Sequence, residues 1–471
     1  MNMKKNVHFL LIIVVVAFTP FLLNVYAEEN ADEYNGYIIK IKEQTQKAIM
    51  LQEYLPLSDL VSCGNGVYIA ADKDTAQRFA LQAEYIEPNY KVELLNTYNY
   101  DTYMQQVNVR LTSIKSAWDI GCYGNNVRIG VIDSGVYEHN ALKGNLSSGY
   151  NYLSKDTDTT DHIGHGTMVS GIIAAQYGYG VIGMAHHAKI IPLKCFENGQ
   201  ATYINTIVSA IYDAVDRFNC DIINLSLGLQ NKSTALEEAV NYAVSKGVLL
   251  VASVGNDSNS AFYYPASYDS VIGVGSVNSS KVRSGFSNYN NSVFVTAPGE
   301  NIIGLSIKGG YVINSGTSFS APVVTGIIAT MFSIDNSLDV AAVKNIFMNT
   351  SEDLGPQGYD TEYGYGLVNA EAIVNYMLSG KDYFVSPIDT QNENFSEVRV
   401  WKNPSVTTYP LGIWASYDNN RITDIKTVSL SFANGSIEIL QYSNEYKTLK
   451  FFLWYNMKSL LPISPSRSVR R

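Results

Sequence analysis

An apolar run at residues 323–332 restricts the possible folds of this chain more than any other feature. The run is long enough for a buried helix. Pro322 directly precedes it and is compatible with a first helical turn, where a missing N–H costs little. Gly316 has no Cβ and allows a tight bend just before the helix begins. The sequence therefore predicts a buried helix with Ser318 at its N-terminus.

A serine at a helix N-terminus has two interpretations. Free backbone N–H groups and the positive end of the helix dipole favour a developing anion, which suits a nucleophile. The alternative is that Ser315, Thr317 or Ser318 merely caps the helix. Because caps are far commoner than nucleophiles, this segment alone favours the cap, and the choice depends on the rest of the chain.

Two further segments supply an aspartate and a histidine. Residues 126–132 are rich in β-branched side chains and predict a buried strand, which ends at Asp133. In an open α/β sheet, ligands gather at the carboxyl ends of the strands. The motif DHIGHGT at residues 161–167 then leads into an apolar helical stretch. Asp133, His165 and Ser318 can thus fill the three roles of an acyl-transfer triad, in that chain order.

Three short blocks carry a resemblance to a known family. Residues 131–136, 165–167 and 316–322 match, in order, the signature blocks of the subtilisin-like serine peptidases. The resemblance covers about residues 105–380 and implies an α/β fold with a doubly wound parallel sheet. It also implies a serine endopeptidase that hydrolyses peptide bonds through an acyl-enzyme intermediate.

The resemblance gives each member of the triad a role. Ser318 is expected to be the nucleophile, and His165 to take its proton and later deliver it to the leaving amine. Asp133 would fix the tautomer of His165 and stabilise the imidazolium. Taken singly, a histidine opening a helix is usually structural and an aspartate at a strand end usually forms a turn. The pattern of all three favours catalysis.

Oxyanion and substrate-binding residues follow from the same resemblance. Asn256 comes after a predicted strand and is expected to donate an N–H to the oxyanion, together with the backbone N–H of the nucleophile. Substrate would lie extended along Ser226, Leu227 and Gly228, where backbone groups can pair with a peptide.

Several neighbouring residues have less definite assignments. Tyr263 stands where many relatives have glycine, so its ring could narrow or reshape the pocket, and no preferred residue before the cut follows. The Tyr264–Pro265 bond is a candidate cis peptide. Asn224 and Asp161 are expected behind the substrate-contacting groups. For Asp161, contact with charged substrate residues and a solvated surface position are both open.

No metal or other cofactor is predicted. Relatives often hold calcium in a loop after the histidine helix and through an aspartate after the first block. Here those positions read QYGYG at residues 176–180 and HNAL at residues 139–142. Both are poor in the oxygen ligands that calcium requires, so the match is weak. His162 and His165 are close enough in sequence to suggest zinc, but no third ligand is evident.

Residues 1–27 predict a secretory signal peptide. Two lysines precede a nearly continuous apolar run at residues 9–23, and Ala27 offers a small residue at a cleavage point. An uncleaved membrane anchor is the competing interpretation, because the run nearly spans a bilayer. Pro20 and Ala27 favour cleavage. We therefore expect a secreted, extracellular protein with no membrane association once the signal is removed.

Residues 28–104 are predicted to form a propeptide. The segment is too short to bury a large core, and its patterns predict a strand, a helix and a closing strand at residues 37–42, 75–83 and 85–90. It resembles the small α+β inhibitor and chaperone of the same family, which implies a self-processing zymogen cut between Asn89 and Thr112. The alternative is a stable N-terminal domain that is never removed.

The catalytic region is assigned to residues 105–380, where strand and helix patterns alternate as a doubly wound parallel sheet requires. The predicted strands are residues 129–133, 188–194, 221–225, 248–254, 271–277 and 293–297. The predicted helices are residues 167–175, 203–217, 233–246, 318–332 and 338–349.

Residues 381–471 are predicted to form an accessory β-sandwich. Helical periodicity disappears there, and a turn signal at Asn434-Gly435 separates two of the short β-rich runs, which are residues 398–401, 427–432, 437–440 and 448–455. The Trp and Tyr side chains either bind glycan or protein or form the core of the sandwich. The basic end, residues 466–471, is interpreted as a solvated tail.

Charge and cysteine content limit the partners. The net charge is -10 with a pI of about 5.2, and no basic stripe is present, so no nucleic-acid partner is expected. The four cysteines do not make a disulfide scaffold. Cys195 and Cys220 are expected to be buried free thiols, with a bridge between them as the alternative. We expect a monomer that acts on protein or peptide substrates and has its own propeptide as an intramolecular inhibitor.

Three other functions compete with a general secreted endopeptidase. The chain could be a non-catalytic binding protein on a peptidase scaffold, against which the complete triad argues. It could be a maturation peptidase with one partner substrate. It could also be a surface adhesin in which the β domain does the main work.

Overall fold

A computed structural model describes ten segments of the chain, which are residues 34–42, 59–64, 67–90, 105–197, 202–391, 395–418, 421–432, 436–443, 448–454 and 467–470. The chain divides into two compact units, Met1–Thr97 and Tyr98–Arg471. The predicted signal peptide, residues 1–27, lies outside the described residues.

The first unit is a small α+β fold. Its four-stranded antiparallel sheet has the order β2 (Val61–Gly64), β3 (Val67–Ala70), β1 (Tyr34–Ile41) and β4 (Ala83–Tyr90). Helix α3 (Lys73–Arg78) begins at Asp72, whose side chain accepts a hydrogen bond from the Thr75 N–H at 2.7 Å. Ile39, Ile41, Ala76 and Phe79 form its core.

The helix predicted at residues 75–83 is wrong in its second half. Tight turns follow Arg78: the N–H groups of Gln82 and Ala83 both bond to the carbonyl of Phe79. Ala83 then begins β4, where it pairs with Ile41. The long-range ladder with β1 therefore overrides the local helical spacing. The strand predicted at residues 85–90 lies within β4, and the one predicted at residues 37–42 agrees with β1 except that β1 ends one residue earlier, at Ile41.

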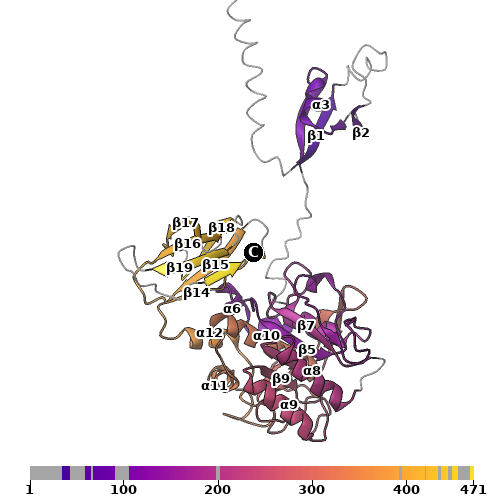
Figure 1. The fold of residues 1–471 in the computed structure, drawn as a ribbon, viewed down its shortest axis with the longest axis vertical. Coiled ribbons are helices and arrows are strands. Elements are labelled where there is room, and N and C mark those ends of the chain that lie inside the picture. The colour runs from indigo at the N-terminus through magenta and orange to yellow at the C-terminus, as the bar shows by residue number, and fades with distance from the viewer. Residues whose placement is uncertain are drawn as a thin grey trace, which may run out of the picture. The chain divides into compact units, whose positions relative to one another are not determined.

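The second unit is built around a seven-stranded sheet in which every recorded pairing is parallel (Figure 1). The strands run in the order β11 (Val295–Pro298), β10 (Ile272–Val277), β9 (Leu249–Ser253), β8 (Ile222–Leu225), β5 (Arg128–Asp133), β7 (Lys189–Lys194) and β6 (Tyr150–Asn151). The predicted α/β fold with a parallel sheet is confirmed, and the predicted strands agree with the observed ones to within two residues at either end.

Alternate residues of each strand face opposite sides of the sheet. Helices cover both faces and bury these side chains. In β5, Ile129 and Val131 belong to one core cluster and Ile132 to the other. The first cluster includes side chains of α7 (His165–Ala174) and α10 (Thr317–Ile334), and the second includes those of α8 (Ile204–Asp216) and α9 (Thr234–Ser245). The sheet is therefore doubly wound.

Helix α10 is the buried helix that the apolar run predicts. Seventeen of its eighteen residues are buried, and Ser318 is the exception. Among the described residues it is also the one helix long and apolar enough to cross a membrane, but the protein itself encloses 89% of that stretch. Its apolar length is explained by its place in the core.

Smaller elements complete the body around this sheet. The predicted helix at residues 338–349 is α11 (Val340–Thr350). The predictions missed α5 (Val107–Leu111), α6 (Lys115–Asp119), the 3-10 helix Asn140–Leu142, α12 (Ala370–Leu378) and the hairpin of β12 (Ile302–Leu305) and β13 (Tyr311–Asn314). Every residue of β13 is exposed, and so the strand has no alternation of buried and exposed side chains.

The C-terminal residues form two antiparallel sheets. One has the order β14 (Tyr383–Val385), β15 (Phe395–Lys402) and β18 (Ile437–Ser443). The other has the order β17 (Arg421–Ser429), β16 (Leu411–Asp418), β19 (Thr448–Trp454) and β20 (Arg467–Arg470). Val398 and Val400 of the first share one core with Trp414 and Phe451 of the second, as in a sandwich. The predicted turn at residues 434–435 lies outside the described residues.

Two arginines connect these strands to the rest of the second unit. Arg399 donates from Nη1 to the carbonyls of Trp118 and Asp119, both at 3.1 Å. Arg467 donates from Nη2 to the carbonyl of Ser333, in α10, at 3.5 Å. The interpretation of residues 466–471 as a solvated tail is wrong for residues 467–470, which form β20 and pair with β19.

Of the aromatic side chains that could either bind a partner or form the core, Trp414 is buried and belongs to the sandwich core.

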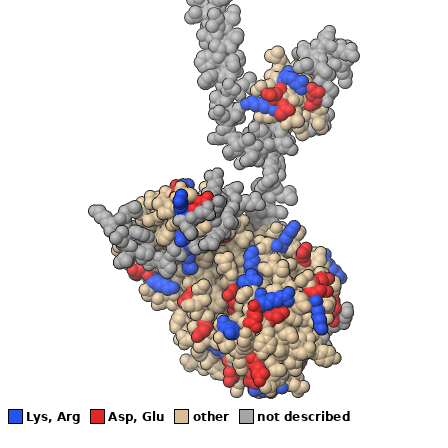
Figure 2. All heavy atoms as spheres, viewed as in Figure 1, with Lys and Arg blue, Asp and Glu red and all other residues tan. Residues whose placement is uncertain are grey.

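The described cysteines are free thiols, and the charged side chains on the face shown are mixed in sign. Cys122, Cys195 and Cys220 are free and buried, so Cys195 and Cys220 form no bridge. Burial raises the pKa of the Cys220 thiol to about 12, which keeps it protonated and unreactive. On the face shown in Figure 2, Lys and Arg lie among Asp and Glu without a large patch of either sign.

Candidate active site

Asp133 and His165 meet at the carboxyl edge of the sheet. Asp133 is the last residue of β5, and His165 is the first residue of α7. The Nδ1 atom of His165 lies 2.8 Å from Asp133 Oδ1 and 2.9 Å from Oδ2. The backbone N–H of Ser134 also donates to Oδ1 at 2.7 Å. Since the carboxylate can only accept, His165 carries its proton on Nδ1 and leaves Nε2 free to accept another.

Two glycines allow this close approach of helix and strand. Gly164 precedes α7 with a φ of 97°, a left-handed conformation that glycine adopts without strain. A Cβ on Gly166 would lie 2.2 Å from the carbonyl oxygen of Gly135 and 3.1 Å from the Cβ of Asp133. Any side chain at residue 166 would therefore push the histidine helix away from the aspartate.

Asp161 organises the start of the histidine helix from a buried position. Its carboxylate accepts from the backbone N–H groups of Ile163, Gly164 and Thr167 at 2.8–2.9 Å. It also accepts from the hydroxyls of Ser134 at 2.9 Å and Thr167 at 2.6 Å. Asp161 thus lies behind the substrate-contacting groups, as predicted. The two alternatives left open for it, a solvated position and a contact with substrate, are wrong, because it is buried to 2% exposure and has five donors within the protein.

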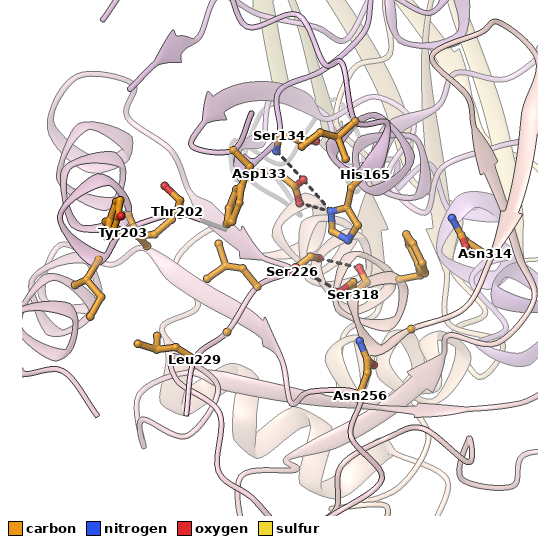
Figure 3. Close-up of a pocket in the computed structure, with 18 of the residues that line it drawn as sticks. Asp133, Ser134, His165, Thr202, Tyr203, Ser226, Leu229, Asn256, Asn314 and Ser318 are labelled. Carbon is orange, nitrogen blue, oxygen red and sulfur yellow. Dashed lines mark hydrogen bonds and ion pairs between the residues drawn. The ribbon is translucent and has the colours of Figure 1, made fainter. Parts of the chain in front are cut away.

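Ser318 reaches the same place from the other side of the site, in the first turn of α10. Its hydroxyl donates to the carbonyl of Ser226 at 3.4 Å, and the Ser226 hydroxyl donates back to the carbonyl of Ser318 at 2.8 Å. In Figure 3 the imidazole of His165 points toward Ser318, with Asp133 behind it. The three predicted triad residues therefore converge although they lie far apart in the sequence.

A chain of buried polar groups fixes this end of α10 to β8. Asn224 donates from its amide to the Ser226 hydroxyl at 2.9 Å and accepts from the Thr325 hydroxyl at 2.9 Å. Asn224 and Thr325 are fully buried. Asn224 thus lies behind Ser226, as predicted, and the network holds the backbone of Ser318 in place.

The electrostatics of His165 follow from its surroundings. Burial on its own lowers the pKa of the imidazole, but the Asp133 carboxylate outweighs this by its charge and its hydrogen bond, with help from Asp161. The net effect raises the pKa above the ordinary value of 6.5. His165 is therefore a stronger base than a free imidazole. About 29% of its side chain is exposed, which gives it access to the cleft.

Asn256 follows β9 and is held in a defined orientation. Its Oδ1 accepts from the backbone N–H of Thr317 at 2.8 Å and from the Thr317 hydroxyl at 2.9 Å. A backbone N–H can only donate, so the amide oxygen must face Thr317. The amide nitrogen then faces away, toward the side of the site where Ser318 lies (Figure 3).

A cleft of about 530 Å³ contains the site. Its lining includes Asp133, His165, Ser318 and Asn256 together with the predicted substrate residues Ser226, Leu227 and Gly228. The lining also includes the apolar side chains of Phe196, Ile204, Ile207, Leu227, Leu229 and Leu236. Tyr263, although predicted to bind substrate, is not among the residues that line the cleft; it packs against Gly228 behind it. The Tyr264–Pro265 bond is cis, as expected.

A charged group beside the site, Lys194, was not predicted from the sequence. Lys194, the last residue of β7 and the partner of Asp133 in the sheet, is buried to 1% exposure. Its ammonium donates to the Thr160 carbonyl at 2.5 Å and pairs with Glu197. The Nδ1 atom of His162 lies 3.0 Å from the other carboxylate oxygen of Glu197. A lysine ending a buried strand was the signal that could have revealed this group.

The positions where relatives often hold calcium do not fit that ion. Gln176 Oε1 accepts from the Gly144 N–H at 3.3 Å, and the Tyr179 carbonyl accepts from the Tyr311 hydroxyl. His139 Nδ1 accepts from the Ala141 N–H at 3.1 Å. These acceptors already have donors, and within the described residues no group of three His, Cys, Asp or Glu could hold a metal. The absence of a metal cofactor stays a prediction.

Comparison with known proteins identifies the family of this chain. The family model described as "Subtilase family" matches residues 124–366. The chain is 34% identical over 371 residues to the "Thermophilic serine proteinase" of Bacillus sp. (strain AK1), covering 75% of this chain and 90% of that protein. It is 38% identical over 259 residues to "Subtilisin DY" of Bacillus licheniformis, covering 54% of this chain and 92% of that one.

A relative with extra length and a solved structure extend the comparison. The "Minor extracellular protease Epr" of Bacillus subtilis (strain 168) is 31% identical over 384 residues, which cover 78% of this chain and 59% of Epr. Among solved structures, the "Proteases from Pseudoalteromonas arctica PAMC 21717" match with a TM-score of 0.54 and 26% identity, over 59% of this chain and 97% of that one.

This chain belongs to the subtilase family. Within that family it is a subtilisin-like serine endopeptidase, which acts on peptide substrates.

Proposed function

We propose that this endopeptidase cuts peptide bonds with Ser318 as nucleophile, His165 as general base and acid, and Asp133 as the group that holds His165. The Ser318 oxygen attacks the scissile carbonyl carbon while its proton passes to His165 Nε2. The C–N bond then breaks, and the same proton goes to the leaving amine. Water hydrolyses the acyl-enzyme by the same route and regenerates the Ser318 hydroxyl.

One observation carries this proposal most directly. The only residue of α10 that is not buried is Ser318, and it shares a cleft with a histidine bonded through Nδ1 to a buried carboxylate. A merely capping serine would need no such partner. The raised pKa of His165 supports its role, because the base must compete for the serine proton near neutral pH.

We assign the oxyanion-binding role to the amide nitrogen of Asn256 and the backbone N–H of Ser318. Thr317 holds the amide oxygen, so the N–H₂ group is positioned before substrate arrives. The Ser318 N–H belongs to the first helical turn, where N–H groups have no acceptor within the helix. Preorganised donors of this kind stabilise the charge that develops on the carbonyl oxygen.

Replacing Asn256 by alanine is expected to lower kcat by roughly 10²–10³-fold with little change in KM, the range already known for the oxyanion asparagine of subtilisin. The ground-state carbonyl needs this donor less than the tetrahedral intermediate does. Steady-state kinetics on one peptide substrate would measure the effect. Asn259→Ala, an exposed position on the same loop, serves as control and should stay within about twofold of wild type. A pure rise in KM for Asn256→Ala would contradict the assignment.

The proposal extends to synthesis and export. Residues 1–27 act as a signal peptide for secretion, residues 28–104 as a propeptide that inhibits the enzyme and is removed by it, residues 105–380 as the catalytic region and residues 381–471 as an accessory β domain. The small α+β fold of the first unit supports the propeptide assignment. The name of the relative Epr supports an extracellular location. The mature enzyme would be a monomer.

A fluorophosphonate probe tests the proposed chemistry. The secreted product is treated with the probe, and peptide mass spectrometry locates the label, while the mass of the intact protein gives its N-terminus. We expect one label on Ser318 and an N-terminus between Asn89 and Thr112. A processed, folded product that takes no label would refute the catalytic role and favour a non-catalytic binding protein. A labelled product that begins at Glu28 would refute only the zymogen.

A further inference from the structure

Two chain segments border Ser318 where the ladder between β8 and β9 ends. The last pair of that ladder is Leu225 with Ala252. Beyond it, the segment after β8 contacts the nucleophile through the Ser226 carbonyl, and the segment after β9 contacts α10 through Asn256. The space between the two segments therefore opens directly beside the nucleophile.

The ring of Tyr263 occupies this space. A Cβ on Gly228, in the first segment, would lie 3.0 Å from Cδ1 of the ring. A Cβ on Gly255, in the second segment, would lie 3.1 Å from Cδ2, the opposite edge. The ring is thus wedged between two glycine backbones, neither of which leaves room for a side chain. The backbone bonds between Leu229 and Tyr264, at 2.8 and 3.0 Å, hold the neighbouring residue against the first segment.

Hydrogen bonds fix the far end of the same ring. The Tyr263 hydroxyl donates to the Asp257 carboxylate, on the second segment, and accepts from the Gln230 amide at 3.0 Å, close to the first. The hydrogen bond to Asp257 and burial raise the pKa of Tyr263, so the hydroxyl stays protonated and keeps donating in mildly alkaline solution. The ring therefore links the two segments and cannot swing out without breaking both bonds.

We propose that Tyr263 restricts this enzyme to substrates with glycine or alanine as the residue that supplies the scissile carbonyl. The inference rests on the proposed roles of Ser318 and Asn256. A substrate with its carbonyl carbon at Ser318 Oγ, its carbonyl oxygen toward Asn256 and its backbone along residues 226–228 would place the side chain before the scissile bond between the two segments. Of the described residues there, Gly228 and Asn256 line the cleft, whereas Gly255, Asp257 and Tyr263 do not. The cleft thus ends where a large side chain would have to continue.

A panel of internally quenched peptides tests the proposal on the unmodified enzyme. The peptides are identical except for Gly, Ala, Leu or Phe before the cut, and mass spectrometry verifies the bond that is cleaved. We expect kcat/KM for Phe to be at least about 100-fold below that for Ala, because overpacking a rigid site costs more than losing a methylene contact. Equal values for Ala and Phe would overturn the proposal without any variant.

Variants of Tyr263 assign the effect to the ring. Tyr263→Gly removes the ring, and the ratio of kcat/KM for Phe over Ala is expected to rise about 100-fold. Tyr263→Phe keeps the ring but loses both hydroxyl bonds, so its ratio is expected to lie between those of wild type and Tyr263→Gly. Phe262→Ala, at the adjacent position with 46% exposure, is the control and should leave the ratio unchanged. A Tyr263→Gly enzyme that keeps the wild-type ratio would contradict the proposal.

Fluorophosphonate labelling separates this failure from that of the catalytic proposal. If Ser318 is not the nucleophile, the wild-type enzyme takes no label on it, and the peptide panel then says nothing about the size of the side chain accepted beside Ser318. If Ser318 is labelled and the peptides are cut without regard to size, only the inference about Tyr263 fails. The labelled fraction of each variant also measures how much of it is folded and active. If Tyr263→Gly does not fold, Tyr263→Ala takes its place.

Discussion

Removal of the Ser318 hydroxyl is expected to lower kcat by roughly 10⁶-fold, the magnitude known for the triad serine of subtilisin. Alanine retains the helix, the cleft and the oxyanion donors, so substrate still binds but no acyl-enzyme forms. The variant cannot process itself, and a trace of tagged wild type must remove the propeptide in trans. A fluorophosphonate then inactivates any residual wild type while leaving Ser318→Ala untouched, which makes so large a loss measurable.

The double variant gives the sharper test of the same prediction. His165→Ala alone is expected to cost about as much as Ser318→Ala, and the two together no more than either. The reason is that base and nucleophile act as one unit, since a proton acceptor without a nucleophile does nothing. Losses that multiply in the double variant would show that the two residues act independently, and the proposed mechanism would be wrong.

Asp133→Asn is expected to lower kcat by roughly 10⁴-fold while leaving the fold intact, as the equivalent change does in other serine proteases. The carboxylate accepts the Nδ1 proton of His165 at 2.8 and 2.9 Å. An asparagine amide can donate there instead, which favours the tautomer with the proton on Nε2 and removes the base. The exposed Asp158→Asn serves as control, with an expected change within about twofold.

The pH profile of the Asp133 variant provides a second readout. In wild type the acid limb of kcat/KM should lie above the ordinary imidazole pKa, because His165 must lose its proton to act and its pKa is raised. Without the Asp133 charge, burial is the main remaining influence and lowers the pKa. The acid limb of the residual activity should therefore move to lower pH. An unchanged limb would mean that another group controls it.

The sequence was sufficient to predict those features whose local pattern agrees with their place in the fold. The apolar run at residues 323–332 could only be buried, and its glycine and proline placed Ser318 at the helix start. The strand ending at Asp133 and the glycine-flanked His165 likewise followed from pattern and resemblance. Geometry then brings these three residues to one cleft, as the chain order of the blocks led us to expect.

Other features depended on contacts that no local pattern records. For Asp161 a substrate contact and a solvated position stayed open, because its five donors come from a loop and a helix start that only the fold assembles. The tail at residues 467–470 looked solvated because its arginines are polar, yet pairing with β19 makes it a strand. Tyr263 could be flagged as unusual, but that its ring fills the space between two glycine segments required coordinates.

Ser318, the one residue of α10 that is not buried, has a consequence for redesigning this enzyme. Every other position along that helix touches the interior, so no substitution there can tune selectivity without also disturbing how the molecule holds together. Engineers who want new cutting preferences should leave the helix alone and vary the loops after β8 and β9. Those loops can change the bonds that are cut while the reacting oxygen stays anchored in an unaltered interior.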